Sequence, residues 1–276
     1  MQQNITTRLD DQLMLEFAIR TGLEGGRPPR RYLWTDAYAV CNYLGRYRDR
    51  KDEAALETAL CLIDQVHDVL GRFSPEGERT GWISGLSDEE GEKHPTAGGL
   101  RIGKPLEERS ADQPYDPGLE WERDGQYYHY LTKWMHALAQ AGRVTGDIRY
   151  IEQGAELAQA AHAAFVHNPV RGQRKMLYWK MSVDLSRPLV PSMGQHDALD
   201  GYLTFVELQA AGTAVKPGSR NLLVAEISEL AMICRGGMWE TDDPLGIGGL
   251  LTDGSRMAQL MREGALTDAS MLSNIL

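Results

Sequence analysis

The sequence of 276 residues predicts an all-α fold built from helical hairpins, because two types of hydrophobic pattern alternate along it. Residues 34–48 are apolar on nearly every side, from Trp34 to Leu44, which is typical of a helix surrounded by protein. Residues 53–70 carry an apolar stripe opposite a polar face, which predicts an outer, partly exposed helix. Helix pairs that repeat this alternation stack into a solenoid or close into a ring.

The alternation recurs in the rest of the chain, and part of it is visible as internal similarity. The sequence Leu-Trp-Thr-Asp at 33–36 is echoed by Leu-Thr-Asp at 251–253. Further helices, inner and outer in turn, are predicted at 126–142, 147–166, 197–211, 220–235 and 246–263. With the helices at 9–21, 34–48 and 53–70, these make eight predicted helices. We expect them to form four pairs in a single domain that spans residues 1–276.

The links between the predicted helices differ in length. Links from an inner to an outer helix are short, as at 49–52, whereas those from outer back to inner cover 73–125, 167–196 and 236–245. Loops longer than about 12 to 15 residues are uncommon unless they are functional or disordered. Because 73–125 is rich in large apolar residues, we expect it to be ordered and to cover the mouth of the assembly. The alternation within 175–183 predicts a short strand at the same rim.

The composition disfavours several classes of function. A formal net charge of −10 disfavours nucleic acid as a partner, because such binding draws on clustered Lys and Arg. No secretory signal or stretch of roughly 18 apolar residues is present, so we expect no membrane contact and a cytoplasmic location. Cys41, Cys61 and Cys234 lie far apart among helical apolar residues, which predicts free thiols.

Two apparent motifs do not predict a cofactor. Residues 98–105 have the glycine and lysine spacing of a phosphate-binding loop, but Pro105 stands where a hydroxyl residue is required. His129 and His136 have Lys133 between them, and an ammonium group does not suit a metal site. The sequence therefore predicts no cofactor and no metal.

Acidic residues gather at the long-loop ends of the predicted inner helices. Asp36 stands near the start of the first, Asp124 precedes the second, and Asp197 begins the third. Each suits a helix N-cap, where aspartate is favoured. Their joint placement favours catalysis, because carboxylates gathered in a partly desolvated mouth acquire the separated pKa values that acid and base work needs. The same ends carry Glu122, His196, Asp200 and Asp253.

Aromatic and basic side chains are expected at the same end of the fold. The indoles of Trp34, Trp82 and Trp179 are candidates for stacking on a sugar ring. His129, Lys133 and His136 form one polar stripe on an otherwise apolar helix, so we expect them to face its lumen. The predicted substrate contacts are Trp34, Trp82, Tyr128, Lys133, Trp179 and Lys180.

A resemblance to known enzymes rests on this alternation and on two segments. These are Leu-Trp-Thr-Asp-Ala-Tyr-Ala-Val (33–40) and Gly-Gln-Tyr-Tyr-His-Tyr-Leu-Thr-Lys-Trp (125–134). The chain resembles in architecture the six-hairpin (α/α) toroid enzymes, which include many glycoside hydrolases, the unsaturated glucuronyl hydrolases and the N-acylglucosamine 2-epimerase group. The resemblance implies carbohydrate chemistry in the mouth of a helical ring. Such rings close with six hairpins, so four pairs predict an incomplete or open ring.

The leading prediction for function is glycoside hydrolysis by two carboxylates, Asp36 and Asp197, with Asp124 as the next choice. One carboxyl group protonates the leaving oxygen while the other activates water or attacks carbon. The alternative enzyme is a sugar epimerase or isomerase, in which His129 and His196 exchange a proton near neutral pH. A non-catalytic helical-repeat binding module is the third hypothesis. In each case the expected partner is a small carbohydrate.

Overall fold

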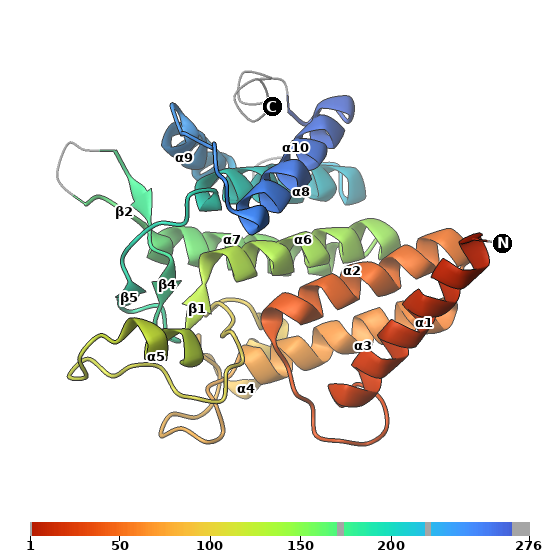
Figure 1. Cartoon of the computed structure of the whole chain (residues 1–276), viewed down its shortest axis with the longest axis horizontal. Coiled ribbons are helices and arrows are strands. Elements are labelled where there is room, and N and C mark those ends of the chain that lie inside the picture. The colour runs from red at the N-terminus through yellow and green to blue at the C-terminus, as the bar shows by residue number, and fades with distance from the viewer. Residues whose placement is uncertain (1, 170–173, 219–221, 267–276) are drawn as a thin grey trace.

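The computed structural model describes residues 2–169, 174–218 and 222–266 of the chain. It is mostly helical, with two small antiparallel sheets at one end (Figure 1), which confirms the predicted helical fold with a short β element. Within these ranges no helix combines the length and hydropathy needed to cross a membrane. The elements in chain order are α1 (Gln2–Arg20), α2 (Leu33–Arg50), α3 (Glu53–Leu70), α4 (Asp88–Lys93), α5 (Pro117–Glu122), β1 (Gln126–Tyr127), α6 (Tyr128–Thr145), α7 (Ile148–Phe165), β2 (Val166–His167), β3 (Met176–Leu177), β4 (Lys180–Met181), β5 (Pro188–Val190), α8 (Asp197–Val215), α9 (Val224–Cys234) and α10 (Pro244–Arg262).

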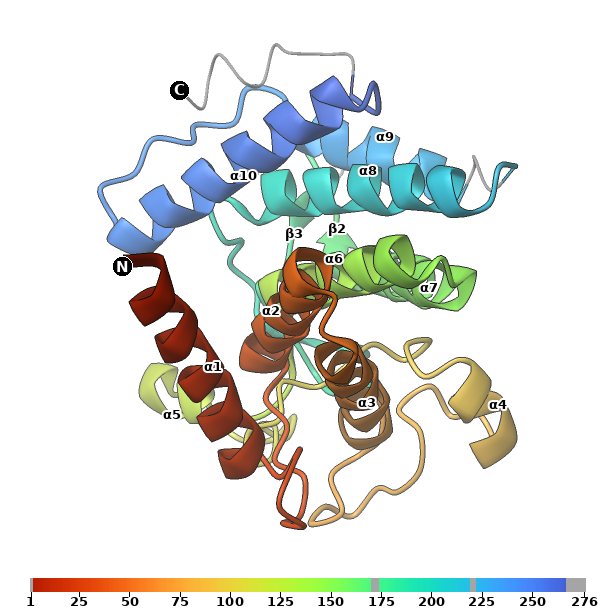
Figure 2. The ribbon, with the colours of Figure 1, turned by 90° about the vertical axis from the view of Figure 1, so that its right-hand side faces the viewer.

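The helices form two layers. In the inner layer α2 packs on α6, α6 on α8, and α8 on α10, while α3, α7 and α9 pack against α2, α6 and α8 from the other side (Figure 2). The α1 helix is joined to α2 by a hydrogen bond from Tyr43 Oη to the Met14 carbonyl oxygen at 3.0 Å. The described part of the chain therefore shows inner helices with outer partners, and it does not show a six-hairpin toroid.

The inner helices differ in how completely they are buried. Every residue of α8 from Asp197 to Leu208 is buried, as expected of a helix surrounded by protein. In α10, by contrast, Leu245 is 86% and Leu251 is 66% exposed. The expectation that 246–263 is an inner helix with little exposed surface is therefore wrong for its first half, because α10 packs along α8 and its opposite side is open.

Two tight turns, one after α2 and one after α6, join an inner to an outer helix through the same local conformation. At the end of α2, Lys51 takes the left-handed conformation (φ 56°), and at the end of α6 Gly146 does so (φ 73°). The next residue is an aspartate in both turns. Asp52 and Asp147 each accept a hydrogen bond from a backbone N–H of the following helix, at 3.2 and 3.0 Å. A left-handed residue ends the first helix, and the aspartate caps the second.

At the opposite end of the helices, Gln126 ties the long loops together. Strand β1 pairs with β4 and β4 with β5, so the loop after α3 leads into a three-stranded sheet. The Gln126 amide accepts a hydrogen bond from Leu100 N at 2.9 Å and donates to the carbonyl oxygens of Gly98 (3.0 Å) and Val183 (2.7 Å). A Cβ atom on Gly99 (φ +77°) would lie 2.1 Å from Gln126 Oε1. Gly98 and Gly99 therefore lie against the Gln126 amide, and this contact explains the glycines without a bound phosphate.

A buried histidine between α3 and α6 makes folding stability depend on pH. His67 Nε2 accepts a hydrogen bond from Trp134 Nε1–H at 3.1 Å, and burial lowers the pKa of His67 to about 3. An unfolded histidine has a pKa of about 6.5, so below that pH the unfolded chain binds a proton that the folded chain does not. The stability that neutral His67 contributes is complete above about pH 6.5. We expect it to fall by up to about 1.4 kcal/mol per pH unit as the pH drops toward 3.

Urea unfolding of the wild type and of His67→Gln between pH 5 and pH 8 measures this contribution. Glutamine keeps an acceptor for the Trp134 indole but does not titrate, so the free energy of unfolding of the variant should depend less on pH below about 6.5. Parallel pH dependences in the two proteins would contradict the expectation.

Candidate functional site

The long-loop ends of α2 and α6 bring together a set of aromatic rings, which we call the aromatic platform: Trp34, Tyr127, His129, Tyr130 and Trp179. The Trp34 ring centroid lies 5.0 Å from that of Tyr130 and 5.8 Å from that of His129. Tyr127 stacks on His129 at 5.3 Å, and Trp179 lies 6.4 Å from His129. Trp34, His129 and Trp179 are half-buried residues.

Next to the platform lie charged side chains from α6, α8 and α10, which we call the charged cluster: Lys133, His136, Asp200, Glu207, Asp253 and Arg256. Lys133 stands one turn after His129 on α6, and its Nζ lies 2.7 Å from Asp200 Oδ1. Arg256 Nη1 contacts the same oxygen at 2.9 Å and Asp253 Oδ1 at 3.3 Å. Two cations from different helices therefore converge on the Asp200 carboxylate.

Glu207 continues the charged cluster along α8. Its Oε2 atom accepts a hydrogen bond from Arg256 Nη2 at 2.9 Å and lies 2.8 Å from His136 Nδ1. Its other oxygen accepts a hydrogen bond from Gln140 Nε2 at 2.8 Å. Arg256 thus bridges three carboxylates, those of Asp200, Glu207 and Asp253.

Two carboxyl groups one turn apart on α8 have opposite environments. Burial alone would raise the pKa of Asp200, but Lys133 and Arg256 outweigh it and lower that pKa well below its usual range. Burial and the neighbouring charge of Asp200 raise the pKa of Asp197 to about 7. Asp197 Oδ2 is buried and has no hydrogen-bond partner among the described residues. Near neutral pH, Asp200 is therefore an anion, whereas Asp197 is partly protonated.

The pKa values of Asp253 and His129 are also shifted from their usual range. Burial and the charge of Asp200 raise the pKa of Asp253. Burial and the nearby charge of Lys133 lower the pKa of His129 to about 4, so its ring is neutral at neutral pH. His129 Nδ1 is buried and lacks a partner in the described ranges. His196 instead lies against the segment before α10, with Nε2 3.0 Å from the Trp239 carbonyl oxygen. The structure therefore gives these two histidines separate sets of partners.

Asp36 is held by groups that lie outside the charged cluster. Its Oδ2 atom accepts a hydrogen bond from Tyr32 N at 2.9 Å, and Oδ1 lies 3.7 Å from Arg31 Nη1. Both side chains of this ion pair are almost completely buried, and burial raises the pKa of Asp36 to about 6. Arg31 also donates to the Thr21 carbonyl oxygen, so the pair fastens the chain after α1 to the start of α2. This setting favours a structural role for Asp36 over the catalytic role expected from its position.

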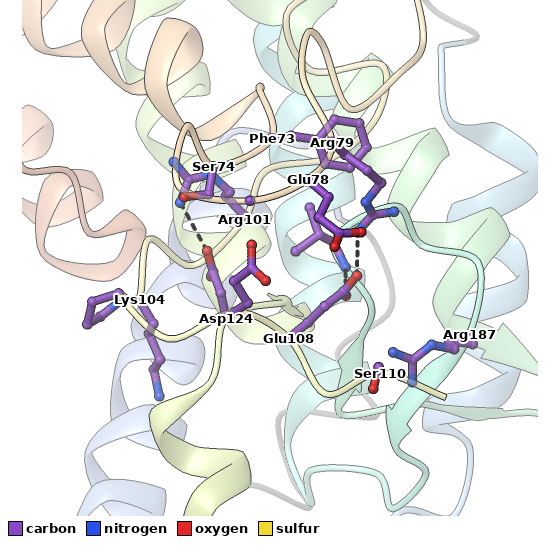
Figure 3. Close-up of a pocket in the computed structure, with 14 residues that line it drawn as sticks. Phe73, Ser74, Glu78, Arg79, Arg101, Lys104, Glu108, Ser110, Asp124 and Arg187 are labelled. Atoms are coloured by element: carbon purple, nitrogen blue, oxygen red, sulfur yellow. Dashed lines mark hydrogen bonds and ion pairs between the residues drawn. The ribbon is translucent and has the colours of Figure 1, made fainter. Parts of the chain in front are cut away.

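Asp124 belongs to a separate pocket of about 290 Å³ between the long loops (Figure 3). Its carboxylate accepts hydrogen bonds from Arg101 Nη1 and from Gly103 N, both at 3.0 Å. Across the pocket Arg79 pairs with Glu108. The carboxylates of Asp36, Asp124 and Asp197 thus have three different sets of partners, and the expected convergence of the three is not observed.

Three of the predicted substrate contacts have buried side chains. Lys180 is fully buried, and its Nζ donates to the carbonyl oxygens of Glu120 (2.7 Å) and Arg123 (2.9 Å) and to Glu120 Oε1 (3.0 Å). Trp82 is 4% exposed, and Tyr128 is fully buried. These side chains hold the loops and the core together, so they are not available to a ligand in this structure. Trp34, Lys133 and Trp179 remain partly exposed.

Glu207 and Arg256 are the members of the charged cluster that sequence reasoning missed. The predicted stripe on α6 has residues at i, i+4 and i+7, and α8 carries a matching polar stripe at Asp200, Thr204 and Glu207. Two helices with complementary stripes of equal spacing are expected to face each other, and this signal could have identified Glu207. Comparison of the chain with protein-family models and with curated proteins finds no match.

Proposed function

We propose that the protein is a carbohydrate-active enzyme that hydrolyses glycosidic bonds, with Asp197 as the general acid and Asp200 as its ionised partner. The observation that carries this proposal is the difference between two carboxyl groups one turn apart: the pKa of Asp197 is raised to about 7, and that of Asp200 is lowered. Glycoside hydrolysis requires one protonated and one ionised carboxyl group at the same bond.

The surroundings of the two carboxyl groups suit these roles. Lys133 and Arg256 donate hydrogen bonds to Asp200 and keep it charged, as a base or nucleophile must be. Asp197 Oδ2 is buried and has no partner among the described residues, so a proton on it is not held by another side chain, and donation to a leaving oxygen requires the substrate to reach this buried atom. The adjacent aromatic platform offers ring faces on which the C–H face of a sugar stacks.

Sugar epimerisation is the second candidate, and His129 is the observation that favours it. This residue is neutral at neutral pH, has an unpartnered Nδ1 atom within the described residues, and lies in the aromatic platform. A neutral imidazole can remove a proton beside a carbonyl group. The Nε2 atom of His196 lies 3.0 Å from the Trp239 carbonyl oxygen, so this second candidate rests on His129 alone.

Proton NMR of the purified protein with a panel of oligosaccharides, aryl glycosides and free sugars tests these alternatives together. We expect new reducing ends from at least one glycoside, and the anomer formed first distinguishes retention from inversion. A change in the configuration of a free sugar without cleavage would favour sugar epimerisation, with His129 as the base. Saturable binding without turnover of any compound would favour the binding module.

A further inference from the structure

Two exposed aromatic residues lie next to the aromatic platform, in α5 and in the loop before it. We call them the distal aromatic patch: Tyr115, which is 52% exposed, and Trp121, which is 51% exposed. The Trp121 ring centroid lies 5.2 Å from that of Trp179 and 6.0 Å from that of Tyr127. The α5 helix lies beside β1 and β4 at the long-loop end of the helices (Figure 1), so the distal aromatic patch continues the platform at this end.

The distal aromatic patch and the platform share the walls of a small cavity. The rings that line it belong to Tyr115, Trp121, Tyr127 and Trp179, and Glu120 also lines it. Its volume is about 30 Å³, which is room for a group the size of a water molecule or a hydroxymethyl group. Aromatic rings supply apolar contacts, and a carboxylate accepts hydrogen bonds. The cavity therefore suits a ligand that presents C–H and O–H groups side by side.

Ion pairs hold the distal aromatic patch in position before any ligand binds. The Glu120 carboxylate on α5 lies 3.0 Å from Lys180 Nζ and 2.9 Å from Arg109 Nε. The start of α5 is capped by Asp116, whose side chain accepts a hydrogen bond from Leu119 N at 3.0 Å. Because the segment is already ordered, stacking a ligand on its rings costs little additional conformational entropy.

The exposed aromatic residues form a series of neighbouring rings. On the other side of the platform, Tyr38 is 47% exposed, and its ring centroid lies 5.3 Å from that of Trp34. From Trp34 the ring contacts continue through His129 and Trp179 to the distal aromatic patch. A pyranose ring is about as large as one aromatic ring, so this series suits several sugar residues in succession. The net charge of −10 disfavours single-stranded nucleic acid, the other chain that stacks on successive aromatic rings.

We propose that the substrate is an oligosaccharide chain and that the distal aromatic patch binds sugar residues remote from the cleaved bond. This inference rests on the proposed function and assigns its substrate class. The bond to be cleaved lies at the charged cluster, and the chain extends over Trp179 toward Trp121. Because neither Tyr115 nor Trp121 transfers a proton, they contribute to the binding of a long substrate and not to that of a short one.

Calorimetric titration with sugars of two lengths tests the proposal. The Asp197→Asn protein is used so that cleavage during the titration is slow, and NMR of each mixture records any product. The probes are the disaccharide and the hexasaccharide of the cello-, malto-, xylo- and chito-oligosaccharide series. In at least one series we expect the hexasaccharide to bind about tenfold more tightly than the disaccharide, because only the hexasaccharide reaches the distal aromatic patch.

Replacement of Trp121 separates the distal aromatic patch from the rest of the site. In the same background, Trp121→Ala should weaken binding of that hexasaccharide about tenfold and leave binding of the disaccharide unchanged. Trp121→Phe keeps a ring and should recover part of the loss. The matched control is Leu119→Ala: Leu119 lies on the same helix and is 41% exposed, but it has no ring, so its removal should change neither affinity.

The proposal is overturned if no hexasaccharide binds more tightly than its disaccharide, or if folded Trp121→Ala protein keeps the full difference. If Trp121→Ala does not fold, the Trp121→Phe protein decides in its place. Tighter binding of hexaproline than of every hexasaccharide would also overturn it, because proline-rich peptides pack on aromatic rings as well.

The same measurements distinguish this inference from the proposed function. Cleavage of glycosides by the wild type, without any dependence of binding on chain length, would contradict only the inference. Length-dependent binding that requires Trp121, without cleavage by the wild type, would contradict only the hydrolysis.

Discussion

The Asp197→Asn protein is expected to cleave its glycoside substrate about 10² to 10⁴ times more slowly than the wild type, because an amide cannot donate the proton that the leaving oxygen needs. The fold should tolerate this change. Asp197 is already partly protonated near neutral pH, and asparagine has nearly the same shape. Values of kcat measured alongside thermal unfolding curves separate loss of chemistry from loss of structure.

Asp253→Asn is the matched control, since the pKa of Asp253 is also raised by burial and by the charge of Asp200. If this variant loses as much activity as Asp197→Asn, the loss of activity does not identify Asp197 as the general acid. Asp200→Asn should also abolish turnover because it removes the ionised partner. Full activity of Asp197→Asn would refute the assignment of the general acid.

The pH profile gives an independent signature of the same residue. A general acid acts only while protonated, so wild-type kcat should fall as the pH rises through about 7, the raised pKa of Asp197. In Asp197→Asn the alkaline limb of the profile should disappear from the residual activity. A limb that persists unchanged in this variant would assign the titration to another group.

The Lys180→Met substitution is expected to lower the free energy of unfolding by about 3 kcal/mol, at the lower end of the usual cost of breaking a buried ion pair. Lys180 is fully buried, and its loss leaves the Glu120 carboxylate and two carbonyl oxygens without their ammonium partner. Arg109 Nε still contacts Glu120 at 2.9 Å, which places the expected effect at the lower end.

Urea unfolding measures this difference, with Lys93→Met as the control. Lys93 pairs with Glu89 and Glu90 on the surface of α4, and exposed pairs contribute less than about 1 kcal/mol. Equal stability of the two variants would show that the Lys180 contacts contribute no more than a surface pair.

Local sequence patterns predict the helices and their layers. The apolar periodicity of α2 and α3 assigns them to inner and outer positions, and Asp52 and Asp147 mark the starts of two outer helices. The exposed first half of α10 was not predictable in this way. Its exposure depends on which elements surround it, and this information is absent from its own sequence.

The same distinction applies to the candidate site. The stripe that contains His129 and Lys133 predicts a polar inner face, and the structure places Lys133 against Asp200. A local pattern does not distinguish an aspartate near a helix start that is exposed to substrate from one that is buried beside a cation, as Asp36 is beside Arg31. Lys180 lies in a short alternating strand, and its acceptors come from a segment about sixty residues earlier, beyond the reach of any local pattern.

The Asp200 carboxylate, which pairs with both Lys133 and Arg256, links positions on three helices, and Arg256 extends the link to Glu207. Arg256 fastens α10 to α8 and, with Lys133, keeps Asp200 charged, so a replacement at residue 256 alters helix attachment and carboxylate chemistry at once. Neutral drift at any one of these positions is then unfavourable unless a second change restores the charge balance. Among natural variants, residues 133, 200, 207 and 256 are therefore expected to change together or not at all, which leaves a co-evolutionary signature across α6, α8 and α10.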